Sequence, residues 1–211
     1  MLTPSTNQVK DVFQRKGYAF FDTGAYNLNI YGIRSKNSQS DKFDDTGGVI
    51  YLDRQGVQRH FYFPITTDPG KHWLLNPLNI GGTALAVPGQ YRGVYVIGIH
   101  GRSWRSGGYE ALEQVRNMRY VRDNNRNSQL DFSLYNDPKN IFEANLKTNF
   151  HRAHKSSILR SIGRYSAGCQ VAQNPEDFDF LLKLCHRQVR NGFGSRFTYT
   201  LLEEKDFGIV S

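Results

Sequence analysis

Hydrophobic and polar residues alternate along much of this chain, which is typical of β-strands that turn one face to a core. The cleanest alternation covers residues 26–33 and predicts a strand with one exposed face. Short segments rich in Gly, Asn and Asp separate the alternating runs and indicate turns. The same pattern predicts further strands at residues 49–52, 58–64, 83–87, 93–99, 109–114, 118–122 and 196–202.

Two other segments have apolar residues every three or four positions, which indicates amphipathic helices. The first covers residues 5–16, with Ser5 or Thr6 as its N-cap. The second follows Asn174 as N-cap and has Pro175 at the first helical position, where a missing N–H is harmless. The residues that repeat on the apolar face of this second helix are Phe178, Leu181, Leu182, Cys185 and Val189.

These elements predict a single domain, residues 1–211, of the α+β class. We expect a mainly antiparallel β-sandwich or barrel-like body, with an N-terminal helix and one helix after the cysteine turn described below. The chain has 38% hydrophobic residues, enough for a full core. No apolar run is long enough to predict a membrane span, and residues 1–17 are too polar for a secretory signal. We therefore expect synthesis in the cytoplasm; action at the cell wall or periplasm would need another exit route or a removed leader.

Lysine and arginine outnumber aspartate and glutamate by 27 to 19, and the formal net charge is +8. A basic surface favours anionic partners such as nucleic acid, phosphorylated envelope polymers or carboxylate-rich substrates. No zinc-finger, RNP or helix-turn-helix pattern accompanies the charges, so nucleic acid is the least supported of these partners. The densest basic group comprises Arg116, Arg119, Arg122 and Arg126.

The most informative chemistry lies around one of the two cysteines, Cys169, which follows His151 by eighteen positions. A thiol becomes a strong nucleophile as a thiolate, and a nearby imidazole is the usual base that produces one. Residues 166–168 are small, which allows a sharp turn whose N–H groups can point at an oxyanion. The other cysteine, Cys185, falls on the apolar helix face, so we expect it in the core and predict no disulfide framework.

Residues 149–173 resemble the active-site motif of the L,D-transpeptidase (YkuD-type) family of peptidoglycan enzymes. The match consists of His151 and, after a gap of comparable length, the sequence Ser-Ala-Gly-Cys that ends at Cys169. The resemblance implies that His151 is the base and Cys169 the nucleophile, with Ser166 and Gly168 completing the catalytic motif. It also implies peptidoglycan stem peptides as partners and a thioester acyl-enzyme as the intermediate.

The chain departs from this family at two positions. Ala167 stands where a second histidine often occurs, and Val171 stands where an arginine commonly follows the cysteine by two. The orientation of the imidazole and the clamp on the substrate must therefore come from other residues. His154 lies three residues after His151 and competes with it for the role of base, although we favour His151. The candidates for substrate binding are His100, Tyr109, Arg152, His154 and Arg164.

Several functions remain open at this point. The leading hypothesis is a cysteine peptidase or L,D-transpeptidase of the cell wall, such as a phage-type lytic protein (an endolysin) or an envelope enzyme. Water as the second acceptor makes it a hydrolase, and an amine makes it a transpeptidase. The alternatives are a non-catalytic virion or cell-wall-binding module with the same fold, and a nucleic-acid-binding protein. We expect no cofactor or metal, because the histidines and cysteines lack the closely spaced pairs of known zinc sites.

Overall fold

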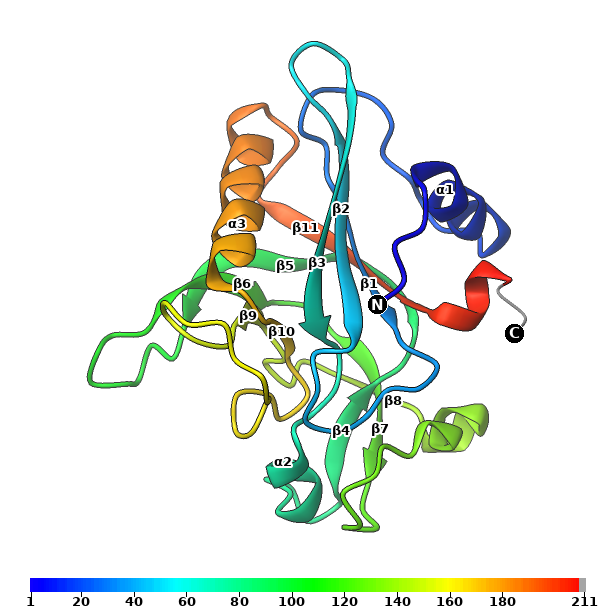
Figure 1. Cartoon of the computed structure of the whole chain (residues 1–211), viewed down its shortest axis with the longest axis vertical. Coiled ribbons are helices and arrows are strands. Elements are labelled where there is room, and N and C mark those ends of the chain that lie inside the picture. The colour runs from blue at the N-terminus through cyan, green and yellow to red at the C-terminus, as the bar shows by residue number, and fades with distance from the viewer. Residues whose placement is uncertain (209–211) are drawn as a thin grey trace.

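The structure is a computed structural model that describes residues 1–208. Eight strands form a closed barrel in the order β1-β11-β5-β6-β9-β10-β3-β2, and three strands form a small sheet in the order β4-β7-β8. Figure 1 shows α1 and α3 on opposite sides of the barrel strands, with the small sheet below them. The sequence-based prediction of an α+β protein with a mainly β body is therefore confirmed, and the body is a barrel.

Neighbouring barrel strands are antiparallel, except that β1 is parallel to β11 and β9 is parallel to β10. The barrel strands are β1 (Asn29–Arg34), β2 (Asp45–Leu52), β3 (Gln58–Thr66), β5 (Gly89–His100), β6 (Tyr109–Gln114), β9 (Phe150–Arg152), β10 (Gln170–Ala172) and β11 (Arg196–Glu203). The small sheet contains β4 (Thr83–Ala86), β7 (Met118–Asp123) and β8 (Phe142–Ala144).

The α-helices are α1 (Thr6–Arg15), α2 (Lys71–Leu75) and α3 (Pro175–Arg190), and short 3₁₀ turns cover Phe132–Asn136, Pro138–Asn140 and Glu204–Phe207. Both predicted helices are present with the predicted caps. The Ser5 side chain accepts from the N–H of Gln8 in a capping box, and the Asn174 side chain accepts from the N–H of Glu176. Within residues 1–208, no helix combines the length and apolar character that a bilayer crossing requires.

The predicted exposed face of the strand at residues 26–33 is wrong. The strand covers residues 29–34 instead, and all of its residues are buried. Its inner face contributes Ile30 to the main core, while its outer face packs Tyr31 and Ile33 against α1 in a second apolar cluster. The helix therefore covers a face that alternation alone assigned to solvent.

α3 lies against β9 and β10 and joins the main core through its apolar face. Cys185 is fully buried there, as predicted, whereas Val189 is 40% exposed and does not belong to the buried face. The sequence pattern did not predict β8, β10 or α2 as elements, and it indicated β9 only through the hydrophobic Phe150 before His151. Each of these strands is three residues long, too short to display a period, yet β9 and β10 carry the motif that resembles an active site.

Candidate active site

The parallel pair β9 and β10 brings His151 and the cysteine turn together. His151 is paired with Val171, and the preceding pair joins Phe150 to Gln170. Cys169 directly precedes β10, next to the pair formed by Gln170 and Phe150. Phe150 and Gln170 are buried on the face opposite to His151. The strand that carries His151 and the segment that follows Cys169 thus lie side by side.

The turn before Cys169 is held by the side chain of Ser166. The Ser166 hydroxyl donates to the carbonyl of Cys169 at 2.9 Å and accepts from the N–H of Gly168 at 3.2 Å. Gly168 has φ +126°, and a Cβ at this position would lie 2.9 Å from the carbonyl oxygen of Ala84. Only glycine fits this conformation and this space. Because the N–H of Gly168 already bonds within the turn, the N–H of Cys169 is the better candidate for an oxyanion donor.

Cys169 is half-buried and faces a cavity of about 360 Å³. Its Sγ lies 3.9 Å from the carbonyl of Lys147. Burial raises the pKa of the Cys169 thiol to about 12, and the backbone N–H of Asn149 partly opposes this effect. The thiol is therefore protonated at neutral pH in the resting protein. A base must take its proton during the attack.

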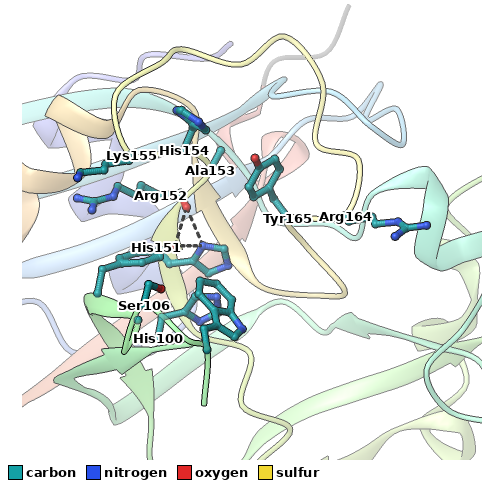
Figure 2. Close-up of a pocket in the computed structure, with 12 residues that line it drawn as sticks. His100, Ser106, His151, Arg152, Ala153, His154, Lys155, Arg164 and Tyr165 are labelled. Atoms are coloured by element: carbon teal, nitrogen blue, oxygen red, sulfur yellow. Dashed lines mark hydrogen bonds between the residues drawn. The ribbon is translucent and has the colours of Figure 1, made fainter. Parts of the chain in front are cut away.

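His151 is oriented by contacts to one of its ring nitrogens. Nδ1 lies 2.9 Å from the carbonyl of Arg152 and 3.1 Å from the Tyr109 hydroxyl, which itself donates to the same carbonyl at 2.9 Å (Figure 2). Since a carbonyl only accepts, the proton of the neutral ring belongs on Nδ1. The other nitrogen, Nε2, is buried and has no hydrogen-bond partner among the described residues, although the Tyr165 backbone also acts on the ring and opposes the lowering of its pKa. Nε2 is the atom free to accept a proton.

A second imidazole lies against the first. The rings of His100 and His151 are stacked with centroids 4.0 Å apart and an interplanar angle of 14°. The Asn149 amide lies 3.1 Å from Nδ1 of His100 and accepts from the N–H of Gln114 at 2.9 Å, which fixes its orientation. Burial, with His100 as a second cause, lowers the pKa of His151 to about 3. Burial also lowers the pKa of His100, so both rings are neutral at pH 7.

The residues predicted to bind substrate gather around one cavity of about 640 Å³ that is also lined by His151. Arg152 is already paired with Asp179 at 3.0 Å and lies over the ring of Tyr109. The His154 ring accepts hydrogen bonds from the backbone N–H groups of Ser156 and Ser157, so it stabilises a turn. The predicted residues on this cavity wall are His100, Tyr109, Arg152, His154 and Arg164.

The nucleophile and the base open onto different cavities. His151 lines the larger cavity and Cys169 the smaller one. No hydrogen bond joins Sγ to the imidazole within residues 1–208, and the pKa directions of the two groups make the resting pair a neutral thiol and a neutral imidazole. These pKa directions disfavour a stored thiolate–imidazolium pair, so an attack by this thiol would require its proton to be transferred in the same step.

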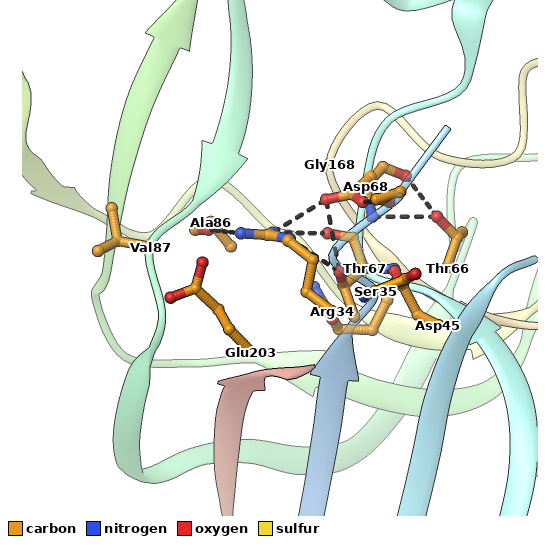
Figure 3. Close-up of polar contacts among 12 residues, drawn as sticks. Arg34, Ser35, Asp45, Thr66, Thr67, Asp68, Ala86, Val87, Gly168 and Glu203 are labelled. Atoms are coloured by element: carbon orange, nitrogen blue, oxygen red, sulfur yellow. Dashed lines mark hydrogen bonds and ion pairs between the residues drawn. The ribbon is translucent and has the colours of Figure 1, made fainter. Parts of the chain in front are cut away.

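A buried ion pair supports the strand end beside the cysteine turn. Arg34, at the end of β1, lies 2.9 Å from the Asp68 carboxylate, and both side chains are almost fully buried. Figure 3 shows its guanidinium between Asp68, the Thr67 hydroxyl at 3.2 Å and a carbonyl of β4 at 3.0 Å. Farther along this segment, the N–H of Gly70 donates to the carbonyl of Ser166 at 2.9 Å. The ion pair therefore fixes the segment that anchors the turn.

Sequence reasoning assigned no role to several residues of the site. Asn149 shares the strand face of His151 by the period of two, so the alternation around the motif could have identified it. Trp104 packs edge-on against His100 with centroids 5.3 Å apart, and only the closure of the β5–β6 loop reveals this contact. Lys155 and Tyr165 complete the wall of the larger cavity. No group of three or more histidine, cysteine or carboxylate side chains forms a candidate metal site in residues 1–208.

No family model, curated protein or solved structure matches the chain. Any statement of function therefore depends on the geometry above and on the local resemblance of the motif.

Proposed function

We propose that this protein is a cysteine-dependent peptidase or L,D-transpeptidase that acts on peptidoglycan stem peptides through a thioester. The observation that carries the proposal is the geometry of His151. Its tautomer leaves Nε2 as a buried, unpartnered acceptor on β9, which pairs with the strand that follows Cys169. A buried polar atom without a partner is unfavourable for stability, so its retention points to a function. The sequence resemblance supports the substrate class.

The proposed reaction needs only the groups present. The thiol of Cys169 attacks a peptide carbonyl while Nε2 of His151 takes its proton, and the N–H of Cys169 stabilises the oxyanion. The C–N bond then breaks, the imidazolium protonates the leaving amine, and a thioester remains. Water or a second amine releases the acyl group in a second cycle of the same proton transfers. The hydrogen bond from Nδ1 to the Arg152 carbonyl stabilises the imidazolium in both cycles.

The intact mass of the protein after incubation with purified stem peptides tests the proposal. We expect a mass increase equal to the acyl part of the peptide on the parent protein and on Cys185→Ser. No increase is expected on Cys169→Ala, and on His151→Gln the rate should fall at least about 100-fold, the usual contribution of a general base. An equal adduct on Cys169→Ala, or no adduct and no turnover on the parent, would overturn the proposal.

A specific observation also favours a second function, the non-catalytic cell-wall-binding module. The protonated thiol and the lack of a hydrogen bond between Cys169 and His151 are equally suited to a site that binds and does not react. Sedimentation with purified cell walls distinguishes the two functions. Wall binding by the parent and by Cys169→Ala alike, without any acyl-enzyme, would favour the binding module.

A further inference from the structure

A separate charged cavity lies at the opposite end of β5 from His100. It has a volume of about 370 Å³ and is formed where the start of β11, the β6–β7 turn and the segment before β1 meet the end of α3. Along β5, at about 3.3 Å per residue, it lies roughly 20 Å from His100. Its wall includes Arg92, Arg116 and Arg196, and we call it the arginine cavity. The residues of the proposed catalytic pair do not line it.

The arginines of this cavity come from three segments and meet beside Gly93. A Cβ built on Gly93 would lie 3.4 Å from Cβ of Arg196 and 3.6 Å from a terminal guanidinium nitrogen of Arg116. The same nitrogen donates to the carbonyl of Arg92, the residue before Gly93, at 3.1 Å. The absence of a side chain at Gly93 thus leaves open the space that these arginines border.

An irregularity in the strand pairing accompanies this arrangement. The register between β11 and β5 shifts at Thr198, which faces a bulge of residues 92–94. Inside the bulge, Gly93 has φ +59° and its N–H donates to the Thr198 hydroxyl at 3.2 Å. β-Bulges commonly redirect side chains next to binding sites. The bulge therefore forms part of the cavity wall, together with the arginines.

The positive charge of the arginine cavity is not compensated by the protein. Its wall contains no aspartate or glutamate, and none of its three arginines has a carboxylate within 4.0 Å among residues 1–208. Asp22 follows Phe21 of the wall, but it is paired with Lys10 at 3.3 Å. Like charges held close together repel one another. Three arginines gathered without a carboxylate therefore indicate that an external anion completes the site.

We propose that the arginine cavity binds the terminal phosphoryl group of a small organic phosphate. Guanidinium groups bind phosphate oxygens in bidentate fashion. A terminal phosphoryl group carries nearly two negative charges at neutral pH, whereas a phosphodiester carries one, so the terminal group matches three cations better. Phe21 and Phe193 also line the cavity, and the ring of Phe193 is 38% exposed, so both can pack against the organic part. The proposal goes beyond the proposed function and does not depend on it.

The shape of the site favours a compact ligand over a nucleic acid. Proteins that bind single strands follow the backbone along a groove and stack successive bases on aromatic side chains. Here the arginines surround one point, in a cavity of about 370 Å³. That volume is near the lower end of the range for small-molecule sites. One phosphoryl group and a short organic part fit this arrangement.

Isothermal titration of the full chain at pH 8 and constant ionic strength tests the proposal. Phenyl phosphate carries a terminal phosphoryl group and a ring, and inorganic phosphate lacks the ring. Phenyl sulfate has the shape of phenyl phosphate with a single charge, and a single-stranded DNA oligonucleotide represents nucleic acid. We expect phenyl phosphate to bind about 10-fold more tightly than phenyl sulfate, because its second charge strengthens the hydrogen bonds from the arginines.

Substitutions locate the binding. Arg92→Gln, Arg116→Gln and Arg196→Gln should each weaken the binding of phenyl phosphate about 10-fold. All three arginines are exposed, so these variants should fold like the parent. Phe193→Ala should weaken the binding of phenyl phosphate and leave that of inorganic phosphate unchanged. Arg54→Gln is the matched control, since Arg54 is an exposed arginine of the β2–β3 turn outside the cavity wall, and it should change neither affinity.

Three outcomes would overturn the proposal. The first is the absence of saturable binding of phenyl phosphate. The second is equal affinity for phenyl phosphate and phenyl sulfate, or an equal loss in Arg54→Gln, because either result would show general attraction to a basic surface. The third is tighter binding of the oligonucleotide that the same three substitutions weaken, which would assign the cavity to nucleic acid. Acyl-enzyme formation on Cys169 is measured separately, so none of these outcomes decides the proposed function.

Discussion

At the scale of single residues, His151 shows how burial changes the chemistry of a histidine. An exposed imidazole titrates near neutral pH, whereas burial and the neighbouring His100 lower the pKa of His151 to about 3. The ring therefore stays neutral, and its free Nε2 remains a proton acceptor, through the whole weakly acidic range. Its partner thiol is held protonated by the same burial. Proton transfer between them must accompany the attack.

This arrangement determines how the activity of the proposed enzyme should decline at low pH, which is the acid limb of its pH profile. If the proposed function holds, we expect kcat/KM to stay constant as pH falls through 6.5 and to decline only toward pH 3, because protonation of Nε2 of His151 would remove the proposed base. The profile of kcat/KM against pH, with a stem peptide, checks this. His100→Phe should move the limb to higher pH, since it removes the imidazole that disfavours a charged His151. A limb near 6.5 in the parent would contradict a buried base.

Gly168 gives a second prediction at the residue scale. We expect Gly168→Ala to lower the free energy of unfolding by about 1–3 kcal/mol, because it adds backbone strain at φ +126° and forces Cβ against the carbonyl of Ala84. Acylation of Cys169 should be lost as the turn shifts. Gly163→Ala is the control, because Gly163 lies in the same loop at φ +54° with open space around its Cβ. Urea unfolding measures the free energy of unfolding of both variants. Equal losses in Gly168→Ala and Gly163→Ala would contradict the steric argument.

At the scale of elements, the cysteine turn is held in place by contacts to the ends of other strands. β1 ends in Arg34, whose ion pair with Asp68 fixes the segment after β3, and that segment bonds to the cysteine turn. A buried ion pair is a poor source of net stability, but losing one partner leaves the other charge buried and uncompensated. The ion pair therefore holds in place the segment to which the cysteine turn is bonded.

We expect Arg34→Met to destabilise the protein by about 3–5 kcal/mol, because Asp68 is left charged and buried. The double variant Arg34→Met with Asp68→Asn should recover much of this loss. Arg59→Met is the control: its pair with Asp53 leaves the Arg59 side chain 56% exposed, and such pairs contribute about 0–1 kcal/mol. Chemical denaturation measures all four proteins, parent included. If Arg34→Met lowered the free energy of unfolding by less than about 1 kcal/mol, this structural role of the ion pair would be contradicted.

At the scale of the whole molecule, the barrel buries histidines in neutral form. Burial lowers the pKa of His60 to about 4, and that of His151 to about 3. In the unfolded chain both histidines titrate near 6.5, so between pH 6.5 and about 3 the unfolded state binds more protons than the folded state. The stability that these groups contribute is complete above pH 6.5 and is lost as pH falls through this window.

These two histidines should make the free energy of unfolding fall from pH 6.5 to pH 4 at constant ionic strength, whereas the buried Asp45, whose pKa is raised to about 8, acts in the opposite direction. His151→Gln should reduce the slope of this fall, because one of the two groups no longer titrates. His186→Gln is the control, since His186 lies on the surface of α3 in an exposed pair with Glu110. Denaturation curves at successive pH values measure the slope. If His186→Gln reduced the slope as much as His151→Gln does, the slope could not be assigned to His151.

The local pattern was sufficient to predict α1, α3 and the longer strands. The caps of α1 and α3 depend on residues three or fewer positions away, and long strands repeat their period often enough to be recognised. The motif also carried the spacing between His151 and Cys169, and every residue predicted to bind substrate lies on the cavity around that histidine. These features were readable because their causes are close together in the chain.

Only the tertiary structure decided the rest. The short β9 and β10 exist because longer barrel strands pair with them, and β1 is buried on both faces because α1 packs across it. The stacking of His100 on His151 depends on contacts between distant segments. The same is true of the neutral state of the His151 imidazole and the Cys169 thiol, and of the separation of the two cavities. Closure of the barrel brings those segments together, and burial then sets their charge. No pattern within one segment contains that information.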